Sequence, residues 1–215
     1  MKKYTDLIFD LDGTLTDPAA GLVSGFRYAL YKMGFPEESA DALRRFIGPP
    51  LLDCWQKEYS LSYEEARKMI ALFREYYDIY GWWDNRPYQG IDATLSELRK
   101  SGKRLFVATS KPEIIAKRVL DLFDLSKYFA FIGGAKDEGE RYTKEEVLAY
   151  VISENSIEKS TALMIGDRCF DAQGARALGI DALAVSYGHG SYAELSSSGF
   201  AAIADSTQDL LKLLL

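Results

Sequence analysis

The sequence predicts an α/β fold, a doubly wound parallel sheet with a small all-helical domain inserted after the first strand. Short apolar runs recur along the chain and end at turn residues, as buried parallel strands do. Helical patterns separate these runs, and this alternation is typical of a doubly wound sheet. The segment between Asp17 and Asn85 interrupts the alternation, because we find no strand pattern in it.

The predicted strands are short apolar runs, and the first of them stops abruptly at Asp10. They are Leu7–Phe9, Arg104–Ala108, Tyr128–Ile132, Ala162–Ile165 and Ala182–Val185. Helices are predicted between them. Pro112 can take the first position of a helix that runs to Phe123, since its missing N–H costs nothing there. Thr143–Glu146 has the pattern of a capping box, and Ser206–Asp209 has a weaker version before the last helix.

The inserted segment is predicted to be helical, and two of its helices have clear signals. Pro18–Met33 carries apolar residues on one helical face, and Ser62–Glu65 has a capping-box pattern that opens a second helix. The second helix continues to Tyr80 with an aromatic face, which we interpret as the core of a small bundle. We therefore expect a core domain of residues 1–16 and 86–215 and a helical domain of residues 17–85.

Composition excludes several classes of protein. The chain has 215 residues and a formal net charge of −6, without a basic run that could neutralise nucleic-acid phosphates. Its two cysteines are too few for a disulfide framework or a cysteine metal cage. We find no membrane-spanning run and no signal peptide at the start. We expect a soluble, cytoplasmic monomer with no nucleic-acid or membrane partner.

Polar residues follow four of the predicted strands. Ligands of parallel sheets bind at the carboxyl ends of the strands, so these residues are the candidates for a site. They are Asp10 and Asp12 after the first strand, Thr109, Ser110 and Lys111 after the second, Lys144 beyond the third, and Asp167 and Asp171 after the fourth.

The two acids after the first strand are the strongest signal. Asp12-Gly13 alone would be a common turn. Asp10, however, would then be an unpaired acid at the end of a buried strand, which is a costly placement. The Asp-x-Asp spacing directs the two carboxylates differently, so one can attack while the other acts as acid and base. Gly13 and the N–H groups after it could form an anion nest.

The other candidates have structural alternatives that the sequence leaves open. Thr109 could bind an oxyanion or simply end a strand, and Lys111 could be a solvated loop lysine. Lys144 at a helix start opposes the helix dipole, which suggests a local task, whereas Lys136 competes for that task from the loop Lys136–Arg141.

Asp167 and Asp171 could merely complement the start of a helix. If the topology is that of the simplest doubly wound sheet, however, Asp167 lies beside Asp10. His189, the sole histidine, lies between two glycines, and we interpret it as a bystander in a mobile loop.

Clustered carboxylates need a cation. Each pair about 4 Å apart repels by roughly 4 kcal/mol at an effective dielectric of 20. An all-oxygen ligand set favours Mg²⁺, which shares its sphere with waters and substrate phosphate. A carboxylate nucleophile beside Mg²⁺, a lysine and a hydroxyl suits phosphoryl transfer through an aspartyl-phosphate.

These residues resemble the motifs of the haloacid dehalogenase superfamily, in its phosphatase branch and closest to the phosphoglycolate phosphatase-like hydrolases. Four segments carry the resemblance, in order along nearly the whole chain. They are Phe9–Leu15 (FDLDGTL), Val107–Pro112 (VATSKP), Lys144, and Gly166–Asp171 (GDRCFD). The resemblance implies a helical cap in the position of the inserted segment.

The resemblance also implies the roles of individual residues. Asp10 would be the nucleophile and a metal ligand, and Asp12 would be the acid and base, with its main-chain carbonyl on the metal. Thr109 and Lys144 would hold the phosphoryl group. Asp167 would complete the metal site, and Asp171 would bind Mg²⁺ directly or through water. We add Gly13, Thr14, Ser110 and Lys111 as candidate phosphate contacts.

The loop Arg45–Leu51 resembles a cap loop that enters the active site, where Arg45 could pair with an anionic substrate group. Its Gly and Pro residues are equally typical of a helix end with a solvated arginine.

We therefore expect a Mg²⁺-dependent phosphatase acting on a small soluble monoester, phosphoglycolate-like or a nucleoside monophosphate. A phosphosugar mutase of the same superfamily is the main alternative. A phospho-accepting receiver module is more distant, because receivers place the phosphorylated Asp after the third strand.

Overall fold

The computed structural model describes residues 4–136 and 141–215. The chain divides into two compact units, and each is described here by itself. The core unit comprises Met1–Asp17 and Arg86–Leu215, and the helical unit comprises Pro18–Asn85. Among the described residues, no helix is both long and apolar enough to cross a membrane.

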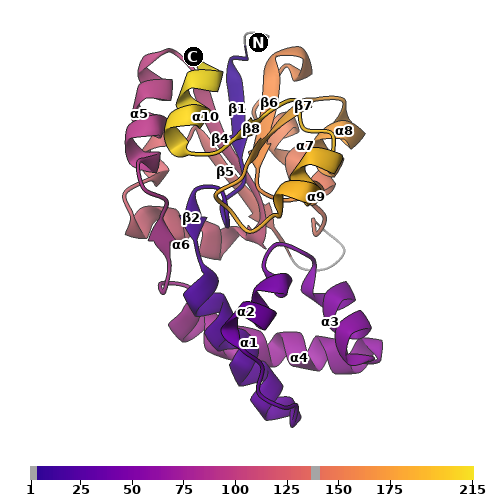
Figure 1. Ribbon diagram of the computed structural model, residues 1–215. Helices are drawn as coiled ribbons and strands as arrows, with labels where there is room; N and C mark the ends of the chain where they lie inside the picture. The colour runs from indigo at the N-terminus through magenta and orange to yellow at the C-terminus, as the bar shows by residue number, and fades with distance from the viewer. Residues whose placement is uncertain (1–3, 137–140) are drawn as a thin grey trace. The chain divides into compact units, whose positions relative to one another are not determined.

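The core unit is built on a parallel sheet with helices on both sides, as the sequence predicts (Figure 1). The strand order is β5-β4-β1-β6-β7-β8, so β1 lies between β4 and β6. Neighbouring strands pair in parallel throughout. The strands are β1 (Asp6–Phe9), β4 (Arg104–Pro112), β5 (Phe131–Ala135), β6 (Ala162–Gly166), β7 (Asp181–Val185) and β8 (Ile203–Ala204).

Two layers of helices cover the sheet, with α5 and α10 packed together on one face and α7 and α8 on the other (Figure 1). The helices are α5 (Ile91–Lys100), α6 (Glu113–Leu122), α7 (Lys144–Glu154), α8 (Cys169–Leu178), α9 (Tyr192–Ser197) and α10 (Thr207–Leu214). Short 3₁₀ turns lie at Ser126–Tyr128 and Lys159–Thr161. Alternate strand residues such as Ile8, Phe106 and Met164 bury against α7 and α8.

The predicted capping boxes at Ser62 and Thr143 are both present. The third strand is displaced, however. It was predicted at Tyr128–Ile132, yet it runs from Phe131 through Gly133 and Gly134 to Ala135. A Cβ on Gly134 would lie 2.6 Å from the backbone of Glu113. Glycine is therefore required at this position of the strand, although glycines in a sequence usually suggest a turn.

A two-stranded antiparallel ribbon lies where the chain leaves the core unit and where it returns to it. β2 (Thr16–Asp17) pairs with β3 (Arg86–Pro87), and Arg86 forms an ion pair with Asp17 at 2.9 Å. Neither strand was predicted, because two residues carry no periodic signal.

The helical unit contains α1 (Ala19–Met33), α2 (Ala40–Leu43), α3 (Leu51–Tyr59) and α4 (Tyr63–Tyr76). A 3₁₀ turn at Arg44–Phe46 follows α2, and π-helical residues Tyr77–Gly81 continue α4. Trp55 is fully buried and packs edge-on against Phe26, Phe46 and Phe73. The aromatic face of α4 therefore forms core, as predicted, except that Tyr80 is exposed.

Candidate active site

Three adjacent strands bring the candidate residues together. β1 pairs with β4 on one side and with β6 on the other. Asp10, Thr109 and Asp167 therefore stand at the carboxyl edge of neighbouring strands, where parallel sheets bind ligands. This topology is the one on which the sequence prediction depended.

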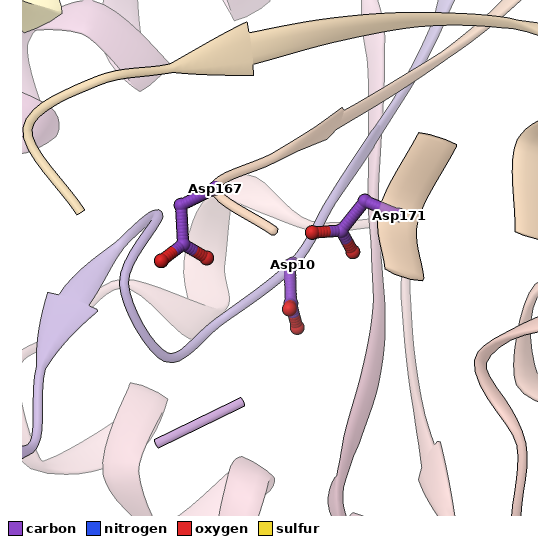
Figure 2. A group of neighbouring side chains, drawn as sticks. All are labelled: Asp10, Asp167 and Asp171. Carbon is purple, nitrogen blue, oxygen red and sulfur yellow. The ribbon is translucent and has the colours of Figure 1, made fainter. Parts of the chain in front are cut away.

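Asp10, Asp167 and Asp171 form one acidic cluster (Figure 2). Each offers a carboxylate oxygen, and these oxygens lie within 4.8 Å of one another. Asp167 and Asp171 are fully buried. Burial, reinforced by the neighbouring carboxylates, raises the pKa of Asp167 well above its ordinary value. Burial likewise raises the pKa of Asp171 to about 6, although Lys144 opposes it. Burial therefore disfavours the charged form of both acids.

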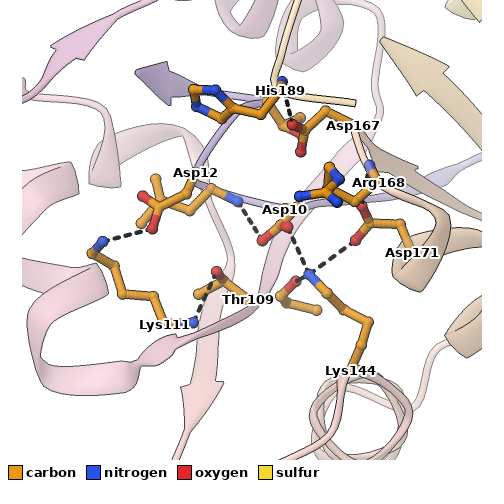
Figure 3. A network of polar contacts seen from close by, with 12 residues as sticks. Asp10, Asp12, Thr109, Lys111, Lys144, Asp167, Arg168, Asp171 and His189 are labelled. Carbon is orange, nitrogen blue, oxygen red and sulfur yellow. Dashed lines mark hydrogen bonds and ion pairs between the residues drawn. The ribbon is translucent and has the colours of Figure 1, made fainter. Parts of the chain in front are cut away.

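Lys144 supplies the cation of the cluster. Its Nζ lies 2.8 Å from Asp10 Oδ2 and 2.9 Å from Asp171 Oδ1, and it donates to the Ala108 carbonyl at 3.1 Å (Figure 3). Burial disfavours the charged ammonium, but the two carboxylates outweigh burial and raise the pKa of Lys144. Lys144 is the first residue of α7, and the Thr143 cap fixes that end of the helix.

Lys136, the competing lysine, has an exposed side chain at the end of β5. Residues 137–140 of its predicted loop lie outside the described residues. Arg141 at the end of that loop is buried and pairs with Glu113 at 2.6 Å, so this residue at least is not solvated.

Glycines allow the acids to approach so closely. A Cβ on Gly13 would lie 2.1 Å from Asp167 Oδ2, and Gly13 has a φ of +83°. A Cβ on Gly166 would lie 2.1 Å from Asp171 Cγ. A side chain at either position would displace a carboxylate of the cluster.

In the turn after β1, two backbone N–H groups donate to carbonyls of the turn itself. Gly13 N–H donates to Thr16 O at 2.8 Å, and Thr14 N–H donates to Leu11 O at 3.2 Å. These two groups are therefore engaged and not free for the anion nest predicted there. The Thr14 hydroxyl lies 3.5 Å from Asp167 Oδ1, on the side of the acidic cluster.

Asp12 faces a different cation. Its Oδ2 lies 2.6 Å from the Nζ of Lys111, whose side chain is buried (Figure 3). Its Oδ1 is buried and accepts no hydrogen bond from the described residues. Lys111 reaches this position because the pairing of β4 with β5 is irregular between Thr109 and Pro112. Lys111 is thus part of the polar network and not a solvated loop lysine.

The remaining residues of the second motif differ in exposure. Thr109 is buried, and its hydroxyl accepts the Lys111 N–H at 3.3 Å. Ser110 is exposed.

Arg45 lies in the helical unit and is engaged there. Its guanidinium forms a two-pronged contact with Glu38, at 2.7 and 3.1 Å, and approaches Glu58 at 3.5 Å. Hydrogen bonds from Arg45 hold the pKa of Glu38 below its usual range.

The loop after β7 is a part of the site that sequence reasoning missed. The N–H of His189 donates to Asp167 Oδ2 at 2.8 Å (Figure 3). A Cβ on Gly188 would lie 2.4 Å from Asp167 Cβ, and one on Gly190 would lie 2.0 Å from Asp167 O. The flanking glycines, which suggested a mobile loop, instead allow this loop to press against Asp167.

Known proteins resemble this chain over most of its length. Residues 7–185 match the model of the family described as haloacid dehalogenase-like hydrolase. A 5'-nucleotidase of Pseudomonas aeruginosa is 37% identical over 90% of this chain and 87% of its own length. The tyrosine-protein kinase PtkA of Mycobacterium tuberculosis is 41% identical over 86% of this chain, which spans only 62% of that relative.

A phosphoglycolate phosphatase of Vibrio parahaemolyticus is 27% identical over 96% of this chain and 94% of its own length. A crystal structure described as a predicted phosphatase from Clostridium acetobutylicum superposes with a TM-score of 0.95 at 38% identity, covering 99% of each chain. The motifs, the sheet order and these matches agree, and the chain belongs to the haloacid dehalogenase-like hydrolases.

Proposed function

We propose that this hydrolase cleaves small phosphate monoesters through a phosphoryl group carried on Asp10, with Mg²⁺ bound by the acidic cluster. The observation that carries the proposal is the position of Asp10. Its carboxylate lies between Lys144, at 2.8 Å, and the buried acids Asp167 and Asp171. Such a carboxylate is suited to attack phosphorus, because the cations around it can offset the charge of the incoming phosphate.

The cluster fits a divalent cation by its donors and by its charge. Three carboxylates converge, all donors are oxygen, and Lys144 bridges two of them. Burial raises the pKa of Asp167 and of Asp171, so a bound cation would favour the charged form of both. Oxygen ligands of this kind suit Mg²⁺, with Asp10, Asp167 and Asp171 as the holding residues. When bound, Mg²⁺ supplies positive charge against the transferring phosphoryl oxygens.

The chain's own residues divide the two steps between them. Asp12 must hold a proton when the ester is bound. A carboxylate oxygen of Asp10 then forms a bond to phosphorus as the ester P–O bond breaks, and Asp12 gives that proton to the leaving alcohol. Asp12 then takes a proton from water, which attacks phosphorus and releases phosphate and the Asp10 carboxylate. Lys144 and the Thr109 hydroxyl bind the phosphoryl oxygens, and Lys111 keeps Asp12 directed toward the site.

We propose that the helical unit acts as a cap that selects the substrate. Support comes from its insertion between β2 and β3 and from the resemblance of its position to the family's small cap. Arg45 remains the proposed anion contact, although its pairing with Glu38 gives it a second, structural task. A nucleoside 5'-monophosphate is the first ester to try, because the 5'-nucleotidase relative is similar over most of both chains.

The test is phosphate release from a panel of esters, with Mg²⁺ and with a chelator. The panel contains nucleoside 5'-monophosphates, phosphoglycolate, sugar phosphates, pyrophosphate and phosphotyrosine. Wild type is compared with Asp10→Asn and with the control Asp41→Asn, whose carboxylate is 99% exposed in the helical unit. Metal-dependent release that is lost only in Asp10→Asn is the expected result. A folded protein that releases phosphate from none of these esters would overturn the proposal.

A further inference from the structure

The turn between β6 and α8 carries two of the three proposed metal ligands. Asp167 is the first residue after β6, and Asp171 lies in the first turn of α8. Both carboxylates are fully buried, and burial raises the pKa of each, with repulsion from Asp10 adding to the rise. Before a cation binds, the two acids repel, so contacts outside the cluster must hold the turn in place.

Glu194 of α9 provides such a contact. Its Oε1 accepts the N–H of Cys169 at 2.8 Å and the Nε–H of Arg168 at 3.0 Å. Cys169 is the first residue of α8, and its N–H is one of those that a helix leaves unpaired at its start. Burial raises the pKa of the Glu194 carboxyl, but these donors outweigh it and lower the pKa below its usual range.

Arg168 connects Glu194 to both acids. Its backbone N–H donates to Asp171 Oδ2 at 3.1 Å, and its side chain is held by Glu194. Arg168 is the residue next to Asp167 in the chain, so Glu194 reaches both acids through it (Figure 3 shows Arg168 between the two acids).

The segment that carries Glu194 is itself held firmly. The Ser191 hydroxyl caps α9 by accepting the Glu194 N–H at 3.1 Å. A few residues earlier, the His189 N–H donates to Asp167 Oδ2, and the Tyr187 hydroxyl donates to Thr14 O at 3.1 Å. The segment 187–194 thus contacts the acidic turn at Asp167, Arg168 and Cys169.

We propose that Glu194 is a positioning residue, which holds the β6–α8 turn so that Asp167 and Asp171 are presented together to the divalent cation. The inference rests on the proposed metal site. Glu194 does not bind the cation or the substrate itself. Removing the Glu194 carboxylate releases Arg168 and the start of α8. Cation affinity should then fall, because the outer partners of metal ligands set the orientation of those ligands.

The experiment measures Mg²⁺ affinity directly, by calorimetric titration of the metal-free protein and by Mg²⁺-dependent thermal stabilisation. Glu194→Ala is expected to weaken Mg²⁺ binding about 10-fold or more. Glu194→Gln keeps an acceptor oxygen for Cys169 and Arg168, so it should recover most of that affinity. Asp209→Ala is the matched control, since Asp209 accepts from Ser206 and Lys212 at the start of α10.

The outcomes separate the two proposals. Wild type that binds Mg²⁺, with Glu194→Ala binding equally well, would overturn the positioning role alone. Wild type that binds no Mg²⁺ would overturn the metal site and this inference together. Should Glu194→Ala fail to fold, Glu194→Gln and Glu194→Asp decide the matter. Binding unchanged in both would contradict the proposal, and weaker binding in Glu194→Asp, which reaches one methylene less far, would support it.

Discussion

Asp10 and Asp12 are two residues apart, yet the charges around them balance differently. Asp12 faces Lys111 at 2.6 Å. Asp10 shares Lys144 with Asp171, while Asp167 adds a third carboxylate within 4.8 Å. A cation thus faces the carboxylate of Asp12, whereas three carboxylates converge at Asp10. In the proposed mechanism Asp10 therefore belongs to the cation and phosphate site, and Asp12 belongs to proton transfer.

The largest effect is expected from Asp10→Asn, which removes the proposed attacking group from the acidic cluster. Turnover should fall about 10⁴-fold or more, as it does when a nucleophile is removed. The metal-free protein should keep its stability, because one of three repelling carboxylates is gone. Phosphate release and thermal unfolding of the same preparation check both statements, and wild-type turnover would exclude Asp10 as nucleophile.

Lys144→Ala should damage both activity and folding. It leaves Asp10 and Asp171 buried without their cation, which typically costs about 3–5 kcal/mol. Turnover should fall about 10²-fold or more, because the lysine also faces the transferring phosphoryl group. Urea unfolding without metal measures the first effect.

Lys136→Ala is the matched control for that variant, since the side chain of Lys136 is exposed. If Lys136→Ala lost activity and Lys144→Ala did not, the assignment of the lysine would be wrong.

The pH dependence of stability tests the raised pKa of the buried Asp171. Burial raises the pKa of Asp171 to about 6, while an unfolded aspartate titrates near about 4. Between these values the folded protein holds the extra proton, so the contribution of Asp171 to stability falls as the pH rises. Metal-free wild type should lose about 2–3 kcal/mol more than Asp171→Asn between about pH 4 and pH 7. Equal losses in the two proteins, measured by urea unfolding, would mean that burial does not raise the pKa of Asp171.

The smallest effect is expected at the pair of Asp12 with Lys111. Lys111→Met leaves Asp12 without its partner, so turnover should fall about 10-fold through impaired proton transfer. Mg²⁺ affinity should stay within about twofold of wild type, since the Lys111 ammonium pairs with Asp12, which is not one of the three acids of the cluster. A Lys111→Met variant that instead lost Mg²⁺ binding would show that the Asp12–Lys111 pair and the acidic cluster do not act separately.

Much of this site could be predicted from the sequence, because strand ends are local signals. A buried apolar run that stops at an acid identifies Asp10 and Asp167, and parallel pairing of β1 with β4 and β6 brings them together. The cation at the start of a helix, unfavourable by itself, identifies Lys144. In each case one residue is unfavourable in its local environment, and its proposed role in the site would explain why it is there.

The rest depends on contacts that no local pattern encodes. The pairing of Lys111 with Asp12 requires the irregular end of β4, and the β5 register requires close packing at Gly134. Glu194 and the His189 N–H reach the acidic turn from a segment more than 20 residues away, 25 for Glu194 to Cys169 and 22 for His189 to Asp167. The one available signal was a histidine between two glycines, which is equally typical of a mobile loop.

The most direct test of the central claim uses Asp12→Asn, p-nitrophenyl phosphate and Mg²⁺. This ester has a good leaving group, so phosphoryl transfer to Asp10 should proceed without an acid, while hydrolysis of the phospho-enzyme should stall without a base. We predict a burst of about one equivalent of nitrophenol per site, with the phosphoryl group mapped to Asp10 after acid quench. Steady release without a burst, or a phosphoryl group on any other residue, would contradict the account.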